Sequence, residues 1–144
     1  MKVIVCDDLL PKNCVAYLFD KDDYSSVLWS VKDFLSTADY SIVNFECPIA
    51  GKGKPIVKCG PSHKCSESGI KAVKWIGFGG VTLANNHFLD YGEDGVLNTL
   101  AICYKHGIDT VGGDKNVDEA SKNLYKEIMV RHLRSSIDVN TNFQ

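Results

Sequence analysis

The stretch GVTLANNHFLDYGEDGVLNTLAICYKHGIDTVGG, residues 80–113, decides the fold class. Its first apolar run (80–85) predicts a strand, and residues 92–107 predict a helix that ends at Gly107, a residue suited to a helix C-terminus. Residues 108–113 then form a second apolar run, which predicts another strand. A strand, a helix and a strand in succession are typical of a unit with parallel strands.

The rest of the chain repeats this alternation. We expect further strands at 3–6 and 40–45, helices at 24–38, 68–78 and 116–130, and a flexible loop at 51–55. The sequence therefore predicts one α/β domain over residues 1–130, with a mainly parallel sheet and flanking helices. Residues 131–144 are expected to form a C-terminal tail.

The composition is that of an ordinary globular protein. Of the 144 residues, 44% are hydrophobic and 24% are charged, and the formal net charge is -2. This balance does not suggest nucleic acid as a partner, and no apolar run approaches the roughly 20 residues that span a bilayer. The N-terminal sequence MKVIVCDDLLPKN lacks the features of a signal peptide. We therefore expect a cytoplasmic protein whose six cysteines are free thiols.

Polar side chains gather where the predicted strands end. They are Asp7 and Asp8, then Asn44 and Glu46, then Asn85, Asn86 and His87, and finally Asp114. Ligand sites of open parallel sheets form outside the carboxyl ends of the strands. Carboxylate, amide and imidazole groups are ligands for a divalent metal such as Mn, Fe, Zn or Mg. The alternative is that these residues only cap helices and make turns, and Asn44 in particular is expected to be a turn residue.

Three separated motifs resemble those of the CapA family of bacterial capsule and poly-γ-glutamate synthesis proteins. They are SIVNFECPI (41–49), TLANNHFLDYGEDGVLNTL (82–100) and HGIDTVGGDKNVDEA (106–120). The motifs follow one another in the family's order, and the resemblance runs from the N-terminus to about Ala120. It implies the first half of a calcineurin-like metallophosphoesterase sandwich. It also implies a metal-dependent hydrolase of phosphoester-like bonds.

The resemblance assigns roles to five residues. Asp8, Glu46 and Asn86 would be metal ligands, and His87 would contact a phosphate or protonate the leaving group. Asp90 would orient the turn and could fix the tautomer of His87. The chemistry agrees with these roles, because a metal-bound water is a nucleophile at neutral pH and a neighbouring imidazole can donate a proton to the departing oxygen.

Two features depart from the metallophosphoesterase pattern. Leu10 stands where such proteins have a histidine two residues after the first aspartate, and the chain has no Gly-His-x-His sequence. We therefore expect a loosely held metal. The alternative function is a non-catalytic remnant, or a partner subunit that binds another chain.

The resemblance to half a sandwich also predicts an association surface. One sheet would keep an apolar face that the missing half would otherwise cover. We therefore expect a homodimer, or a partner chain that completes the fold. The alternative is a self-sufficient three-layer sandwich, with helices 24–38 and 68–78 on one side of the sheet and helices 92–107 and 116–130 on the other.

Overall fold

The computed structural model describes residues 1–122 and residue 124. They form a four-stranded sheet in the order β1-β2-β3-β4, in which every neighbouring pair is parallel. The strands are β1 (Val3–Leu9), β2 (Tyr40–Phe45), β3 (Gly80–Thr82) and β4 (Asp109–Val111), and the helices are α1 (Asn13–Asp20), α2 (Ser25–Leu35), α3 (Ser68–Ile76), α4 (Gly92–His106) and α5 (Val117–Ala120). The predicted α/β class with a mainly parallel sheet is confirmed.

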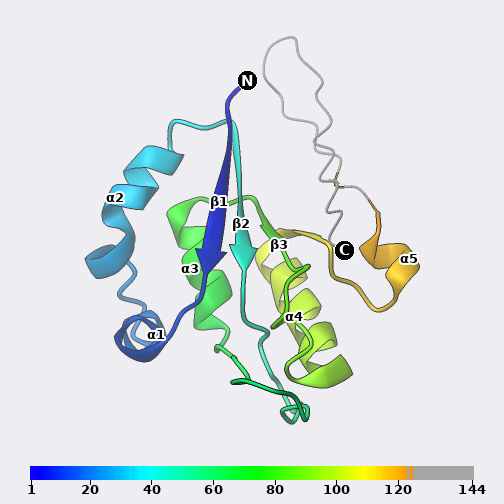
Figure 1. The fold of residues 1–144 in the computed structure, drawn as a ribbon. Coiled ribbons are helices and arrows are strands. Elements are labelled where there is room, and N and C mark those ends of the chain that lie inside the picture. The colour runs from blue at the N-terminus through cyan, green and yellow to red at the C-terminus, as the bar shows by residue number, and fades with distance from the viewer. Residues whose placement is uncertain (123, 125–144) are drawn as a thin grey trace.

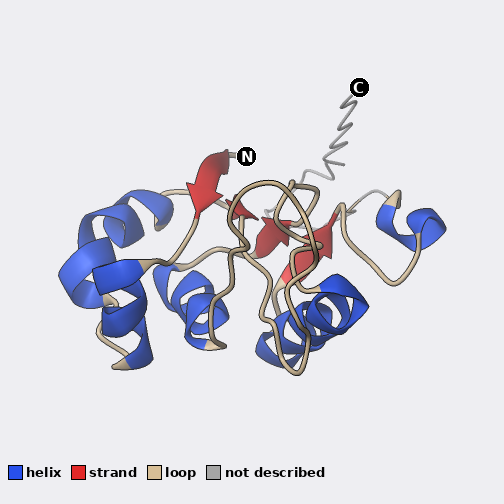
Figure 2. Cartoon of the chain, turned by 60° about the horizontal axis from the view of Figure 1, so that its bottom comes forward, coloured by secondary structure: helices blue, strands red, loops and turns tan. Residues whose placement is uncertain are grey.

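Helices α1 to α4 lie on one face of the sheet (Figures 1 and 2). The main core fills the space between them, where Val43 of β2 joins Ile70 of α3 and Cys103 of α4 in one cluster. Successive strand residues point to opposite faces, so Ile42 points away from this core and joins a smaller cluster with Val111. The alternative three-layer arrangement, with helices 68–78 and 92–107 on opposite sides of the sheet, is wrong, because α3 and α4 share the same core and cover the same face.

Glycines end two of the helices. Gly107 follows α4 in the left-handed conformation (φ 64°), as predicted. The helix predicted over 68–78 ends earlier, at Ile76, because Gly77 adopts φ 108°. None of the helices in the described part of the chain is long and apolar enough to cross a membrane.

The C-terminal helix predicted over 116–130 is shorter than expected. Helix α5 begins after Asn116, whose side chain accepts a hydrogen bond from the Glu119 backbone, and it stops at Ala120. The rest of that prediction beyond residue 124, and the tail at 131–144, lie outside the described residues.

Helix α1 was not predicted. Its eight residues are too few to show a clear helical period, and its N-cap, Lys12, makes no side-chain capping bond. Tertiary packing stabilises it instead, because Phe19 is fully buried against Tyr24 and Ala72. The ring centroids of Phe19 and Tyr24 lie 5.5 Å apart in an edge-on arrangement.

Candidate metal site at the carboxyl ends of the strands

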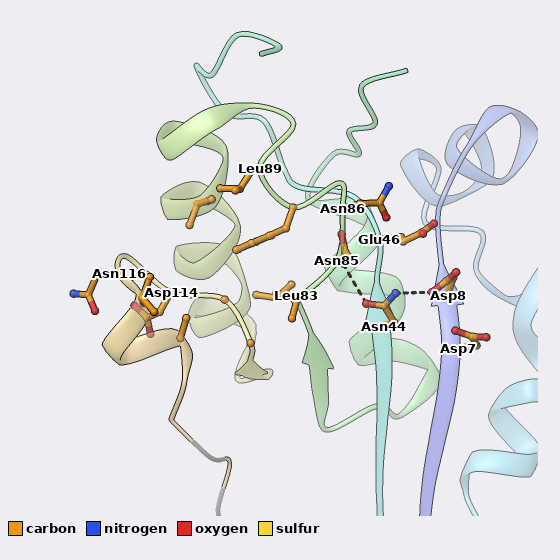
Figure 3. A pocket seen from close by; sticks show the side chains of 17 residues that line it. Asp7, Asp8, Asn44, Glu46, Leu83, Asn85, Asn86, Leu89, Asp114 and Asn116 are labelled. Carbon is orange, nitrogen blue, oxygen red and sulfur yellow. Dashed lines mark hydrogen bonds between the residues drawn. The ribbon is translucent and has the colours of Figure 1, made fainter. Parts of the chain in front are cut away.

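A cavity of about 830 Å³ lies at the carboxyl ends of the strands (Figure 3). Its wall includes all three residues assigned as metal ligands, namely Asp8, Glu46 and Asn86. Figure 3 shows Asp114 and Asn116 on the opposite side of the cavity. Among the described residues that line it there is no lysine, arginine or histidine. The polar groups of the wall are therefore carboxylates and amides, which attract a cation, and they lie beside apolar side chains such as Leu83 and Phe88.

Both Asp7 and Asp8 line the cavity, and a β-bulge determines which of them pairs with Asn44. Strand β1 is longer than the predicted 3–6 because it continues through both aspartates to Leu9. Cys6 pairs with Val43 and Asp8 pairs with Asn44, so Asp7 is the extra residue of β1. Bulges re-aim side chains near functional sites. Here the bulge places Asp8, and not Asp7, opposite Asn44.

Asn44 orients Asp8. Its amide nitrogen donates to Oδ1 of Asp8, and its amide oxygen accepts from Asn85 Nδ2 at 3.1 Å (Figure 3). The same oxygen also accepts from Thr82 Oγ1 at 3.1 Å. These bonds join β1, β2 and the end of β3 in one polar network. The expectation that Asn44 is a turn residue is wrong, because it lies within β2 and supports the neighbouring carboxylate.

The turn after β3 is held by Asn85 and by close packing against the segment that follows β4. Asn85 Nδ2 donates to the Phe45 carbonyl at 3.0 Å, and its Oδ1 accepts from the His87 backbone N–H at 3.1 Å. The segment after β4 approaches this turn closely because Gly113 has no side chain. A Cβ atom on Gly113 would lie 2.5 Å from Cε1 of Phe88.

His87 and Asp90 lie beside the cavity and not in its wall. The Asp90 side chain is fully buried, and its Oδ2 lies 2.8 Å from Nδ1 of His87. Lys58 pairs with the other carboxylate oxygen, and the His63 backbone N–H donates to Oδ2 at 2.7 Å. The imidazole rings of His63 and His87 pack face to face in a tilted arrangement, with centroids 4.2 Å apart.

Two ionisable groups of this cluster have perturbed pKa values. Burial acts to raise the pKa of Asp90, but the hydrogen bonds from Lys58, the His63 backbone and His87 outweigh it, so the pKa lies below its usual value. Burial, followed by the charges of His87 and Lys12, lowers the pKa of His63, against the opposing effect of Asp90 and Glu46. At neutral pH the cluster therefore contains an ionised Asp90 and a neutral His63.

Comparison with known proteins identifies the family. The family model described as "Bacterial capsule synthesis protein PGA_cap" matches residues 2–138. The chain belongs to this family. It is 31% identical over 101 residues to a Bacillus anthracis "Capsule biosynthesis protein CapA". The aligned region covers 68% of this chain and 25% of that protein. It is also 25% identical over 118 residues to a Bacillus subtilis (strain 168) "PGA biosynthesis protein CapA". That alignment covers 81% of this chain and 31% of that protein.

These matches confirm the resemblance to the CapA family. The chain spans about a quarter to a third of the length of these curated relatives. The four-stranded parallel sheet with its helices is consistent with part of a metallophosphoesterase-like domain.

The donor set at the cavity suits a hard divalent cation. Asp8 and Glu46 supply carboxylate oxygens and Asn86 supplies an amide oxygen. Mg²⁺ is commonly bound by one or two carboxylates and keeps several waters, and Mn²⁺ prefers similar ligands. Within residues 1–122 and 124, no group of three or more His, Cys, Asp or Glu side chains is placed to hold a metal by itself. Leu10 adds no ligand, because its side chain has no donor atom, and it packs against the main core.

Two residues of this cluster, Lys58 and His63, were not predicted as part of the site. Lys58 lies 32 positions before Asp90, in a loop without a periodic pattern. The contact of His63 with His87 depends on how the loop folds back over the turn. Neither contact can be inferred from local spacing.

Proposed function

We propose that this chain carries the metal site of a CapA-type hydrolase that acts in capsule or poly-γ-glutamate biosynthesis. Its substrate would be a phosphoester or a related bond. The proposal depends chiefly on one observation. The three residues that the resemblance assigns as metal ligands, Asp8, Glu46 and Asn86, come from separate strand ends and line one cavity, and the described residues of its wall include no cationic side chain. Membership of the capsule synthesis protein family supports the same proposal.

Asp8, Glu46 and Asn86 would hold a divalent ion, with Mg²⁺ or Mn²⁺ favoured over Zn²⁺ and Fe²⁺ by the oxygen donors. A bound ion supplies Lewis-acid activation of a substrate oxygen and lowers the pKa of a coordinated water. Asn44 would hold the Asp8 carboxylate in a fixed orientation through its hydrogen bond. With so few protein ligands, we expect the ion to exchange readily.

The hydrogen bonds of His87 define which ring nitrogen is available. The ionised carboxylate of Asp90 can only accept hydrogen bonds, so the proton of a neutral His87 ring lies on Nδ1. With that proton on Nδ1, the Lys58 ammonium 3.3 Å away has no lone pair to donate to there, and its hydrogen bond goes to Asp90 Oδ1. Nε2 is then free to accept a proton, and in the charged ring it can donate one to a leaving oxygen.

Metal binding tests the site directly. Mn²⁺ is titrated into the purified protein and the free ion is followed by electron paramagnetic resonance. We expect saturable binding that Asp8→Asn and Glu46→Gln each weaken at least about tenfold. Asp114→Asn is the matched control, because it removes a carboxylate from the opposite side of the same cavity and is expected to leave the affinity nearly unchanged.

Hydrolysis of bis(p-nitrophenyl) phosphate with Mn²⁺ or Mg²⁺ tests the reaction. Turnover that His87→Ala abolishes would support a hydrolase. Metal binding without turnover of phosphodiester or phosphomonoester probes would contradict the hydrolase and leave a metal-binding role. The absence of Mn²⁺ binding at millimolar concentration would overturn the site itself.

A further inference from the structure

The loop between β2 and α3 covers the back of the His87 turn. The Ile56 backbone N–H donates to the Asp90 carbonyl at 2.9 Å, and the His63 backbone N–H donates to the Asp90 carboxylate. Gly53 approaches the same segment so closely that a Cβ atom there would lie 2.5 Å from the Tyr91 carbonyl oxygen. Residues 53–63 are therefore fastened to the turn by backbone and side-chain contacts.

The two carboxylate oxygens of Asp90 have different partners. The Lys58 ammonium pairs with Oδ1, while His87 Nδ1 and the His63 N–H both approach Oδ2. The Asp90 side chain has no exposed surface and that of Lys58 is 20% exposed, so water competes little for either group. A carboxylate held at both oxygens cannot rotate, and the direction of Oδ2 then sets the plane of the His87 ring.

His63 packs on one face of the His87 ring. Its imidazole packs on that of His87, and its Nε2 lies 3.2 Å from Nζ of Lys12, a residue that follows β1. With His63 neutral, its Nε2 can accept a hydrogen bond from the Lys12 ammonium. The His87 ring is thus fixed in plane by Asp90 and against its face by His63, and both contacts depend on the loop that carries Lys58.

We propose that Lys58 is a positioning residue of the site, which acts through Asp90 to hold the His87 imidazole with Nδ1 protonated and Nε2 available. The catalytic part of this inference rests on the proposed function, but the effect on the ring does not. Partners of this kind, one step removed from the reacting group, typically change activity or metal affinity by about 10–100-fold when they are removed.

Nuclear magnetic resonance of the histidine rings tests the inference without any assay of activity. Long-range ¹H–¹⁵N spectra of ¹⁵N-labelled protein distinguish the Nδ1–H from the Nε2–H tautomer. We expect His87 in the wild type to show the Nδ1–H form. Lys58→Met should reduce that form or replace it with a mixture, and Lys58→Arg, which keeps a charged donor, should restore it.

Lys64→Met is the matched control. Lys64 belongs to the same loop, but its ammonium lies over the Tyr91 ring at 5.6 Å from the centroid, so its loss should leave the His87 signals unchanged. Should Lys58→Met fail to fold, Lys58→Gln takes its place, because it removes the charge and keeps a donor. A folded Lys58 variant without the charge that retains the wild-type His87 tautomer would overturn the proposal.

Hydrolysis of the model phosphodiester separates this inference from the proposed function. We expect Lys58→Met to lower kcat about 10–100-fold with little change in KM, and Lys64→Met to stay within about twofold of the wild type. No turnover by the wild type would overturn the hydrolase. The tautomer of His87 would then still decide the role of Lys58.

Discussion

Nδ1 of His87 lies 2.8 Å from Oδ2 of Asp90, a carboxylate whose side chain is fully buried. The two residues are three positions apart, and a turn in which the Asp90 N–H donates to the His87 carbonyl at 2.9 Å brings them together. A buried charge is tolerated only when it is paired and hydrogen-bonded. Lys58 and the His63 backbone complete that requirement, so the histidine and the loop over it depend on the same carboxylate.

Asp90→Asn should destabilise the protein strongly. The substitution removes the negative charge that faces the Lys58 ammonium and leaves that cation with only a neutral amide. Breaking one side of a buried ion pair typically costs about 3–5 kcal/mol, and we expect a loss of that size in the free energy of unfolding. Urea unfolding at pH 7 measures it. Asp33→Asn, at an exposed position of α2, should change the same quantity by less than about 0.5 kcal/mol.

The effect of Asp90 on stability should depend on pH. Its pKa in the folded protein lies below the ordinary value of 3.8, so its contribution is fully present above that value and is lost as the pH falls through the lower, folded pKa. The difference in unfolding free energy between the wild type and Asp90→Asn should therefore be constant near neutrality and shrink below pH 3.8. A difference that stays constant into strong acid would contradict this assignment.

Asn44→Ala should weaken metal binding without removing a ligand. Asp8 would lose the hydrogen bond that orients it, and Thr82 and Asn85 would lose a shared acceptor. We expect the Mn²⁺ affinity, followed by electron paramagnetic resonance, to fall about 10-fold or more. Asn98→Ala is the control, since Asn98 bonds the Ile49 carbonyl at 2.9 Å and does not line the cavity. Equal affinities for both variants would show that Asn44 does not position the ligand.

Local periodicity predicted the elements that have enough residues to display it. The strand at 40–45 has the predicted bounds, and α4 ends before Gly107 as expected. The resemblance to the CapA family likewise pointed to three residues that line one cavity, because parallel strands bring their carboxyl ends to the same edge. These predictions depend on residues that are close together in the sequence, so their pattern can be seen without the structure.

The parts that were missed depend on register and on distant contacts. Pairing between strands reveals the bulge at Asp7, and no spacing within β1 shows it. The role of Asn44 follows from that register, because the bulge sets Asp8 opposite it. Lys58 reaches Asp90 across 32 positions through an irregular loop. Contacts of this kind are specified by the folded chain as a whole.

Gly113→Ala should disturb the site through packing. The added Cβ would lie 2.5 Å from Phe88 Cε1 and 2.7 Å from Leu83 Cβ, and both of these side chains are buried. We expect a loss of about 1–3 kcal/mol in the free energy of unfolding and a displaced turn, with weaker Mn²⁺ binding as a result. Chemical unfolding and the Mn²⁺ titration measure the two effects.

Gly60→Ala provides the contrast for this variant. Gly60 has φ 89° but open space around it, so the substitution should cost only backbone strain, about 1–2 kcal/mol, and leave metal binding unchanged. If Gly60→Ala also lost Mn²⁺ affinity, the effect of Gly113→Ala would be due to general destabilisation and not to a displaced turn.

The sheet face opposite helices α1 to α4 is the expected site of self-association. Ile42 and Val111 on this face are buried in a small cluster with Leu124, whereas Val5 on the edge strand β1 is 70% exposed. We expect a two-fold dimer that buries this face, so light scattering at micromolar concentration should give about twice the monomer mass of 15.9 kDa. Val5→Lys should shift the protein to monomer, because dimerisation would bury an unpaired charge. Val57→Lys, at a fully exposed loop position, should leave the dimer intact. A wild type that scatters as a monomer over the whole concentration range would rule out the dimer.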